Sequence, residues 1–189
     1  MNQALVLLLV VSAFATGMGV AVARAARRDR RPLNHRPGTR RILLPFAGTS
    51  ISRRALEAAV RLARAEDATI MPTFLAQVPR RLPLDAPLPN QCLRSMPVLE
   101  AIEQLAIAQG VKVDARVGRG RSYRDALNRL LAEQPVDRII ISATADPRPG
   151  LTDADLQWLL QKVPAEILIL RPAREDLRLI SGDAIQGHF

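Results

Sequence analysis

The side chains best suited to chemistry in this sequence are two histidines and one cysteine. His35 and His188 lie far apart in the sequence, and neither has a second ligand or a base at the spacing that metal binding or acid-base catalysis requires. Cys92 has no local base that would favour its thiolate. We therefore expect no catalytic residue and no metal site, and we interpret the protein as a non-enzyme.

A Gly-Arg-Gly-Arg run, residues 118–121, is the strongest candidate for contacting an anion. Glycines let backbone N–H groups approach a ligand, and arginines supply positive charge. A turn from a strand into a helix explains the glycines equally well, so both interpretations stay open.

Trp158 also has two interpretations of equal weight. It belongs either to a partner-binding surface, where tryptophan is enriched, or to a site that the apolar tail residues Leu177, Leu179 or Ile180 cover.

Positive charge is concentrated in one segment of the chain. The formal net charge is +9, but residues 24–41 hold eight arginines and one acidic residue, a net of +7, which leaves +2 for the rest. A domain with so balanced a charge lacks the basic face of a nucleic-acid binder. We therefore expect no nucleic-acid partner.

An uncharged apolar run of 20 residues, Ala4 to Ala23, precedes those arginines. As a helix it would be ~30 Å long, the thickness of the hydrocarbon core of a bilayer. We predict a transmembrane anchor at 1–23, in the lipid through residues 4–23, and a basic linker at 24–40. Because positive loops stay on the cytoplasmic side, the soluble domain is expected there, in a single-pass topology.

A cleaved signal peptide is the alternative interpretation of the N-terminus. Ala21-Val22-Ala23 matches a small-residue cleavage site, and cleavage would export the domain. The absence of a basic residue before the apolar run, and the length of that run, favour the anchor.

From Arg41 onward, short apolar runs alternate with amphipathic stretches, a pattern typical of a parallel sheet covered by helices. We predict a domain at 41–172 and a tail at 173–189 to which we assign no structure. The predicted strands are 42–46, 69–75, 111–117, 139–142 and 167–170. The predicted helices run from about 52 to 67, from 97 to a glycine cap at 110, and onward from caps at Ser122 and Thr152.

Four details of this prediction are specific. Pro72 indicates a bulge or an early end of the second strand, because proline cannot donate to the ladder. Residues 77–96 are expected to form a long loop. Alternating polarity over 111–117 places the third strand at an edge. In the last helix, the core-facing stripe is predicted to exclude Trp158 and to comprise Leu156, Leu159, Leu160 and Val163.

These segments resemble the universal stress protein family. The matching stretches are Arg41 to Pro45, Gly48-Thr49, Ala55-Leu56, Ala58 to Ala63, Gly120 to Leu131, Asp137 to Ile141 and Pro164 to Arg171. The resemblance spans 41–171 and implies an α/β fold: a five-stranded parallel sheet of order 3-2-1-4-5 with helices on both faces. It also implies a homodimer, commonly paired through the last strand.

The same resemblance locates a nucleotide site whose signature residues are replaced. Nucleotide-binding members carry a Pro-x-Asp-Gly-Ser run after the first strand, and here Ala47 stands at the Asp position. They also carry a G-x-x-G run and a later G-[ST], and here the small residues are Ser142 and Ala145. The position that corresponds to the family's later glycine lies within Asp153 to Asp155, where this chain has no glycine. The family-site positions are Gly48, Thr49, Gly118, Gly120, Ser142 and Ala145.

A phosphate cradle needs glycines and the positive end of a helix, so acidic residues at that helix start disfavour it. We therefore expect a membrane-tethered domain without an ATP cofactor. It is expected to act by dimerisation or by binding an unidentified protein partner, with a role in the stress response. The alternative is a nucleotide-binding member of the family that uses an altered cradle.

Overall fold

The computed structural model describes residues 40–142, 151–171 and 179–181. Contacts divide the chain into two units, 1–38 and 39–189, and the description below concerns the second. The predicted anchor, its alternative cleavage site, the linker up to Thr39, both histidines and Ala145 lie outside these residues. Within the described ranges, none of the helices combines the length and the apolar character needed to span a bilayer.

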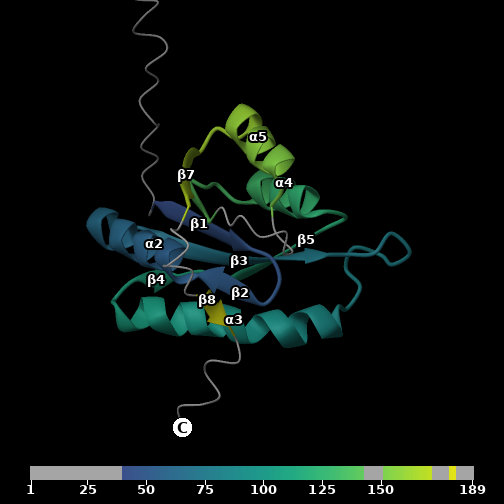
Figure 1. Cartoon of the computed structure of the whole chain (residues 1–189), viewed down its shortest axis with the longest axis horizontal. Helices are drawn as coiled ribbons and strands as arrows, with labels where there is room; N and C mark the ends of the chain where they lie inside the picture. The colour runs from purple at the N-terminus through teal and green to yellow at the C-terminus, as the bar shows by residue number, and fades with distance from the viewer. Residues whose placement is uncertain (1–39, 143–150, 172–178, 182–189) are drawn as a thin grey trace, which may run out of the picture. The chain divides into compact units, whose positions relative to one another are not determined.

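A parallel sheet forms the centre of the unit (Figure 1). Its strand order is β4-β3-β1-β6-β7, and β5 continues along β3 beyond β4. The strands are β1 (Arg41–Phe46), β3 (Thr69–Gln77), β4 (Lys112–Val113), β5 (Arg116–Gly120), β6 (Arg138–Ser142) and β7 (Glu166–Leu170). With β4 and β5 taken as one interrupted third strand, this is the order 3-2-1-4-5. The third strand lies at an edge, as its alternating polarity predicted.

Pro72 lies in β3, which is continuous, and the break occurs in the neighbouring edge strand, between β4 and β5. β3 runs without a bulge for nine residues, so the predicted bulge or early end is wrong. The register pairs Ile70 with Val113 and Thr73 with Arg116, so both pairs keep the same offset. The N–H and C=O groups of even-numbered β3 residues point toward β4 and β5, since the Ile70 carbonyl accepts from Asp114 N–H at 2.9 Å. Proline offers no N–H on that side, and the edge strand breaks opposite it.

Two helices cover each face of the sheet, as predicted (Figure 1). α2 (Arg53–Glu66) and α3 (Pro89–Ala108) pack on the face that includes Ile42 and Leu44. α4 (Tyr123–Glu133) and α5 (Asp153–Lys162) pack on the face that includes Leu43. All three β1 side chains are essentially fully buried, which is expected for a central strand of a parallel sheet.

Helix α3 starts earlier than predicted. Pro89, and not Pro97, is in the first turn of the helix, and Pro97 lies inside it. The loop that was predicted to run from 77 to 96 therefore ends at Leu88. Both prolines suit a first turn, where the missing N–H costs nothing. The buried residues Leu88, Ser95 and Val98 show that the first half of the helix already packs on the core. Gly110 ends the helix with φ of 73°, as predicted.

The C-terminal tail returns to the domain through a short strand. β8 (Leu179–Ser181) pairs antiparallel with β2 (Ser50–Ser52), the segment that leads from β1 into α2. The register pairs Ile180 with Ile51. β8 therefore forms a two-stranded sheet with β2, whereas the sequence alternative paired the tail residues Leu179 and Ile180 with Trp158.

The predicted stripe of α5 is correct for Leu156, Leu159 and Val163, which pack on the core, but Trp158 packs there too and Leu160 does not. The Trp158 ring packs beside the core cluster around Leu159, and the Arg124 guanidinium lies 5.8 Å from the ring centroid. Leu159 is fully buried, but Leu160 is 61% exposed. The core-facing side of α5 therefore includes Trp158 and excludes Leu160, and Leu159 is its one fully buried side chain.

Candidate functional site

The family-site positions that the structure describes lie toward the carboxyl ends of the parallel strands, where ligand sites of open α/β sheets form. Gly48 follows β1, Gly118 and Gly120 lie in β5, and Ser142 ends β6. β1 and β6 are neighbours, so Gly48 and Ser142 belong to adjacent strand ends. β3 and β1 separate β5 from β6, which puts the two glycines of β5 ~14 Å from Ser142 at the usual strand spacing.

The turn after β1 keeps the backbone conformation of a loop that approaches a ligand, but it lacks a carboxylate. Gly48 has φ of 78°, a left-handed conformation that favours glycine. Its carbonyl accepts a hydrogen bond from the Ser95 hydroxyl at 2.7 Å. Ala47 is half-buried and offers only a methyl group, while Thr49 is exposed. Ser95 was missed because the sequence placed it in a loop instead of in α3.

The glycines of β5 are explained by packing against α4. A Cβ on Gly120 would lie 2.2 Å from the Ala126 nitrogen, and one on Gly118 would lie 3.3 Å from the Leu75 Cδ2 atom. β5 and α4 are thus in close contact, with no room for a larger residue at Gly120. Of the two interpretations of this run, the structure favours the strand-to-helix turn.

The arginines of the same run donate to backbone carbonyls. Arg119 Nη1 donates to the carbonyls of Asp85 at 2.9 Å and Ala86 at 3.2 Å. Arg121 Nη1 donates to the Leu82 carbonyl at 2.8 Å and also to those of Val78 and Pro79. All five acceptors belong to the loop between β3 and α3, so these guanidinium groups fix the backbone of that loop.

Ser142 carries an unpaired buried hydroxyl. Its Oγ atom is inaccessible to solvent and has no hydrogen-bond partner among residues 40–142, 151–171 and 179–181. A buried hydroxyl without a partner is unfavourable, so such a group needs a structural or functional explanation.

The N-terminus of α5 is already occupied by a side chain of the chain itself. The Asp155 carboxylate accepts from the Thr152 N–H at 3.0 Å, and the Thr152 hydroxyl accepts from the Asp155 N–H at 3.3 Å, which completes the predicted capping box. Arg124 Nε donates to the same carboxylate at 2.9 Å. Burial raises the pKa of Asp155, but the hydrogen bonds from Thr152 and Arg124 outweigh burial and leave the pKa below its ordinary value. A negative charge is therefore held at the N-terminus of α5.

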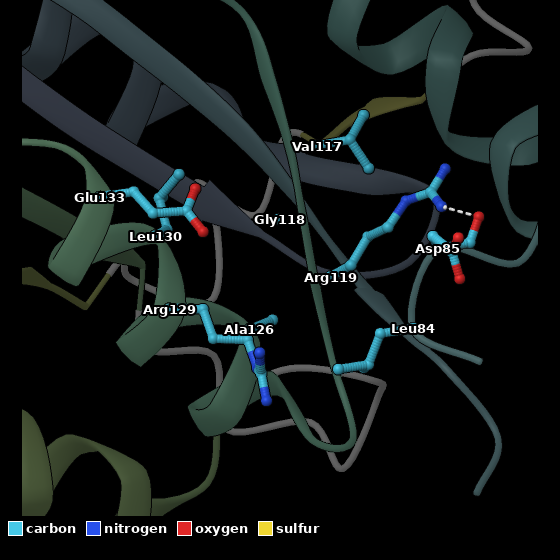
Figure 2. Close-up of a pocket in the computed structure, with 9 residues that line it drawn as sticks. All are labelled: Leu84, Asp85, Val117, Gly118, Arg119, Ala126, Arg129, Leu130 and Glu133. Atoms are coloured by element: carbon cyan, nitrogen blue, oxygen red, sulfur yellow. Dashed lines mark hydrogen bonds between the residues drawn. The ribbon is translucent and has the colours of Figure 1, made fainter.

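A cavity of about 350 Å³ lies at the outer edge of β5, between α4 and the loop before α3 (Figure 2). Leu84, Val117 and Leu130 supply apolar walls, and Glu133 and Arg129 extend from α4 beside it. Among the family-site positions, only Gly118 lines this cavity. It is separate from the strand ends of β1 and β6.

The described part of the chain holds no group of three or more histidine, cysteine, aspartate or glutamate side chains arranged to bind a metal. Cys92 is half-buried in the first turns of α3.

The sequence model of the universal stress protein family matches residues 38–156. The chain belongs to this family. No curated protein matches the sequence closely enough to be reported.

Solved universal stress proteins share the fold at low sequence identity. One from Burkholderia pseudomallei is 20% identical with a TM-score of 0.52, covering 70% of this chain and 96% of that one. One from Archaeoglobus fulgidus in complex with dAMP is 14% identical, with a TM-score of 0.52 and coverage of 70% and 97%. A further one in complex with cAMP is 18% identical, with a TM-score of 0.51 and coverage of 71% and 98%.

Proposed function

We propose that this universal stress protein is tethered to a membrane and acts through a second copy of itself or a protein partner, without catalysis and without a nucleotide phosphate at α5. The proposed setting is a stress response on the cytoplasmic side. The observation that carries the proposal is the Asp155 carboxylate at the N-terminus of α5.

Electrostatics supports this proposal. A helix N-terminus attracts anions because its first N–H groups are free and its dipole is positive there. In α5, Asp153 and Asp155 both lie in the first turn, and the side chains of Thr152 and Asp155 cap each other. A phosphate would have to displace Asp155 from Thr152 and Arg124 and would then lie beside a second carboxylate.

The outer edge of β7 supports contact with another chain. Among the strands that the structure describes, β7 pairs only with β6, so its other edge is open. Ile169 in this strand is 41% exposed, and Leu160 of the adjacent helix α5 is 61% exposed. An open strand edge with exposed apolar side chains favours pairing with a second strand.

The proposed membrane tether is supported by the amino-acid sequence of the N-terminal segment. The apolar run at 4–23 has the length of a bilayer span, and the arginines that follow it favour a cytoplasmic domain.

Calorimetric titration of the detergent-solubilised full chain with ATP, AMP and cAMP tests the nucleotide part. We expect no heat of binding. Binding in the micromolar range, or a nucleotide that copurifies with the chain, would overturn this part of the proposal.

Analytical ultracentrifugation tests the interface. We expect a dimer for the natural chain and a monomer for Ile169→Asp, because a buried unpaired carboxylate opposes association. Ile107→Asp is the matched control, since Ile107 is also exposed but lies on α3, and this variant should remain a dimer.

A second candidate function is nucleotide binding in an altered cradle. The unpaired Ser142 hydroxyl at the end of β6 and the left-handed Gly48 turn after β1 favour it. The related structures in complex with cAMP and dAMP also support it. In that case a nucleotide raises the melting temperature of the full chain, and Ser142→Ala or substitution of Gly48 reduces the rise.

A further inference from the structure

The loop of residues 79–88, between β3 and α3, has a defined shape and is called the arginine loop below. The Leu82 N–H donates to the Pro79 carbonyl at 3.0 Å, and the Ala86 N–H donates to the Pro83 carbonyl at 3.1 Å. These bonds close two successive β-turns. Arg80 and Arg81 are the two central residues of the first turn.

Arginines from outside the loop hold it in this shape. Arg121 Nη1 bonds the Leu82 carbonyl at 2.8 Å, and Arg119 Nη1 bonds the Asp85 carbonyl at 2.9 Å, with further carbonyls bonded by each. At the base of the loop, Gln91 Nε2 donates to the Gln77 carbonyl at 2.8 Å. Ordering a loop in advance lowers the entropy cost of binding at its tip.

The tip of the arginine loop presents positive charge and one apolar side chain. Arg80 and Arg81 are exposed and form no ion pair with any side chain that the structure describes, and Leu82 is 36% exposed. Arg119 and Arg121 add two positive charges below the tip, against one carboxylate of the loop, Asp85. Figure 1 shows the loop projecting beyond the ends of β5 and α3.

We propose that the arginine loop docks the domain onto anionic lipid headgroups at the membrane surface. Guanidinium groups bind phosphate oxygens in a bidentate manner, and an adjacent leucine enters the headgroup region. A projecting turn suits a flat bilayer, whereas the balanced charge of the domain as a whole disfavours nucleic acid.

The arginine loop would give the tethered domain an orientation. This inference rests on the proposed tethering. A linker of 17 residues reaches up to ~60 Å when extended, whereas the radius of gyration of a domain of this size is ~15 Å. The tether alone therefore allows any face of the domain to reach the lipid, and a cationic loop selects one face.

Site-specific fluorescence on the full chain tests this docking. An environment-sensitive dye is attached to Leu82→Cys in a Cys92→Ser background, and the protein is reconstituted in vesicles of phosphatidylcholine or of an equal mixture with phosphatidylglycerol. We expect a blue shift of the dye emission only in the mixed vesicles, reversed by high salt because screening weakens the attraction. A dye at Ile107→Cys, which is exposed on α3, should show no shift.

Charge variants separate the arginine loop from general attraction to the vesicles. Arg80→Gln with Arg81→Gln should abolish the shift, while Arg61→Gln with Arg64→Gln, a pair of exposed arginines on α2, should preserve it. No shift in the mixed vesicles, or equal losses in the two double variants, would overturn the proposal. Flotation with pure phosphatidylcholine vesicles reports the tether separately, so a failed anchor is distinguished from a failed loop.

Discussion

The two ends of the parallel sheet are built differently. At the amino ends of the strands, ionic side chains pair with one another: Arg138 contacts Glu66 at 2.7 Å and Glu166 at 2.6 Å, and Arg40 contacts Glu66 at 3.1 Å. The Arg41 N–H also donates to the Asp137 carboxylate at 2.8 Å. Charges at this end satisfy each other within the fold.

At the carboxyl ends of the strands, several side chains have no charged partner among the described residues. Among the described residues, the buried Ser142 hydroxyl has no hydrogen-bond partner, and Arg80 and Arg81 of the arginine loop form no ion pair. Arg119 and Arg121 bind backbone carbonyls instead of carboxylates. The comparison indicates that the charges at the amino end are paired with one another, whereas at the carboxyl end the paired charges of Arg124 and Asp155 lie beside arginines that bind only carbonyls or form no described ion pair.

The largest effect is expected from Gly120→Ala at the carboxyl end. The added Cβ would lie 2.2 Å from the Ala126 nitrogen, so β5 and α4 must separate, and we expect a loss of about 3 kcal/mol in the free energy of unfolding. Urea denaturation of the full chain in detergent measures it.

Gly110→Ala is the control for this experiment. Gly110 has φ of 73°, but its Cβ would meet no atom within 4 Å, so only the left-handed backbone opposes alanine, at about 1 kcal/mol. Equal losses for the two variants would show that packing against α4 does not explain Gly120.

The next effect concerns the amino end. Arg138→Met leaves Glu66 and Glu166 without their shared partner, and because the Arg138 side chain is only 14% exposed we expect a loss of about 2 kcal/mol. Arg53→Met removes an exposed pair with Glu57 and should cost less than about 0.5 kcal/mol. If the two variants unfold at the same urea concentration, the paired charges at the amino end do not have the stabilising role expected of them.

Sequence patterns were sufficient for most helix starts and for the edge position of the third strand. The N-caps Ser52, Ser122 and Thr152 all accept from the N–H three residues later, because capping is a local interaction between neighbours in the sequence. The strand order came from the family resemblance, and the alternating polarity of 111–117 independently placed the third strand at an edge.

Interactions between distant segments were not predictable in the same way. Whether Pro89 or Pro97 begins α3 depends on how the helix packs, not on proline itself. The pairing of β2 with β8 joins residues 50–52 to 179–181, and nothing local in either segment specifies the other.

The candidate site was only partly predictable for the same reason. The replacement of its signature residues is visible in the sequence, but the roles of Gly120 and Arg121 depend on contacts with α4 and the arginine loop. A glycine required by packing and a glycine required by a ligand look identical in a sequence.

A smaller effect is expected at the start of α5. Thr152→Ala removes the hydroxyl that accepts from the Asp155 N–H, and we expect a loss of about 1 kcal/mol, whereas Thr152→Ser keeps the hydroxyl and should be nearly neutral. Urea denaturation compares the two variants. Equal stability of the two variants would mean that the capping box does not hold the helix start closed.

The smallest effect is a difference in acid sensitivity between the two ends. Hydrogen bonding from Arg138 is the main cause that holds the pKa of Glu66 below its ordinary value of 4.5. At the other end, hydrogen bonds from Thr152 and Arg124 outweigh burial and hold the pKa of Asp155 below 3.8. A lowered carboxyl pKa contributes stability above the ordinary value, and that contribution is lost as the pH falls through the folded-state pKa.

Stability should therefore begin to fall below pH 4.5 through Glu66 and below pH 3.8 through Asp155. Glu66→Gln should flatten the curve of unfolding free energy against pH from the higher value downward, and Asp155→Asn should flatten only its more acidic part. Urea titrations of both variants at a series of pH values measure the two curves. If Glu66→Gln leaves the pH dependence unchanged, the paired charges at the amino end are not what makes that end stable.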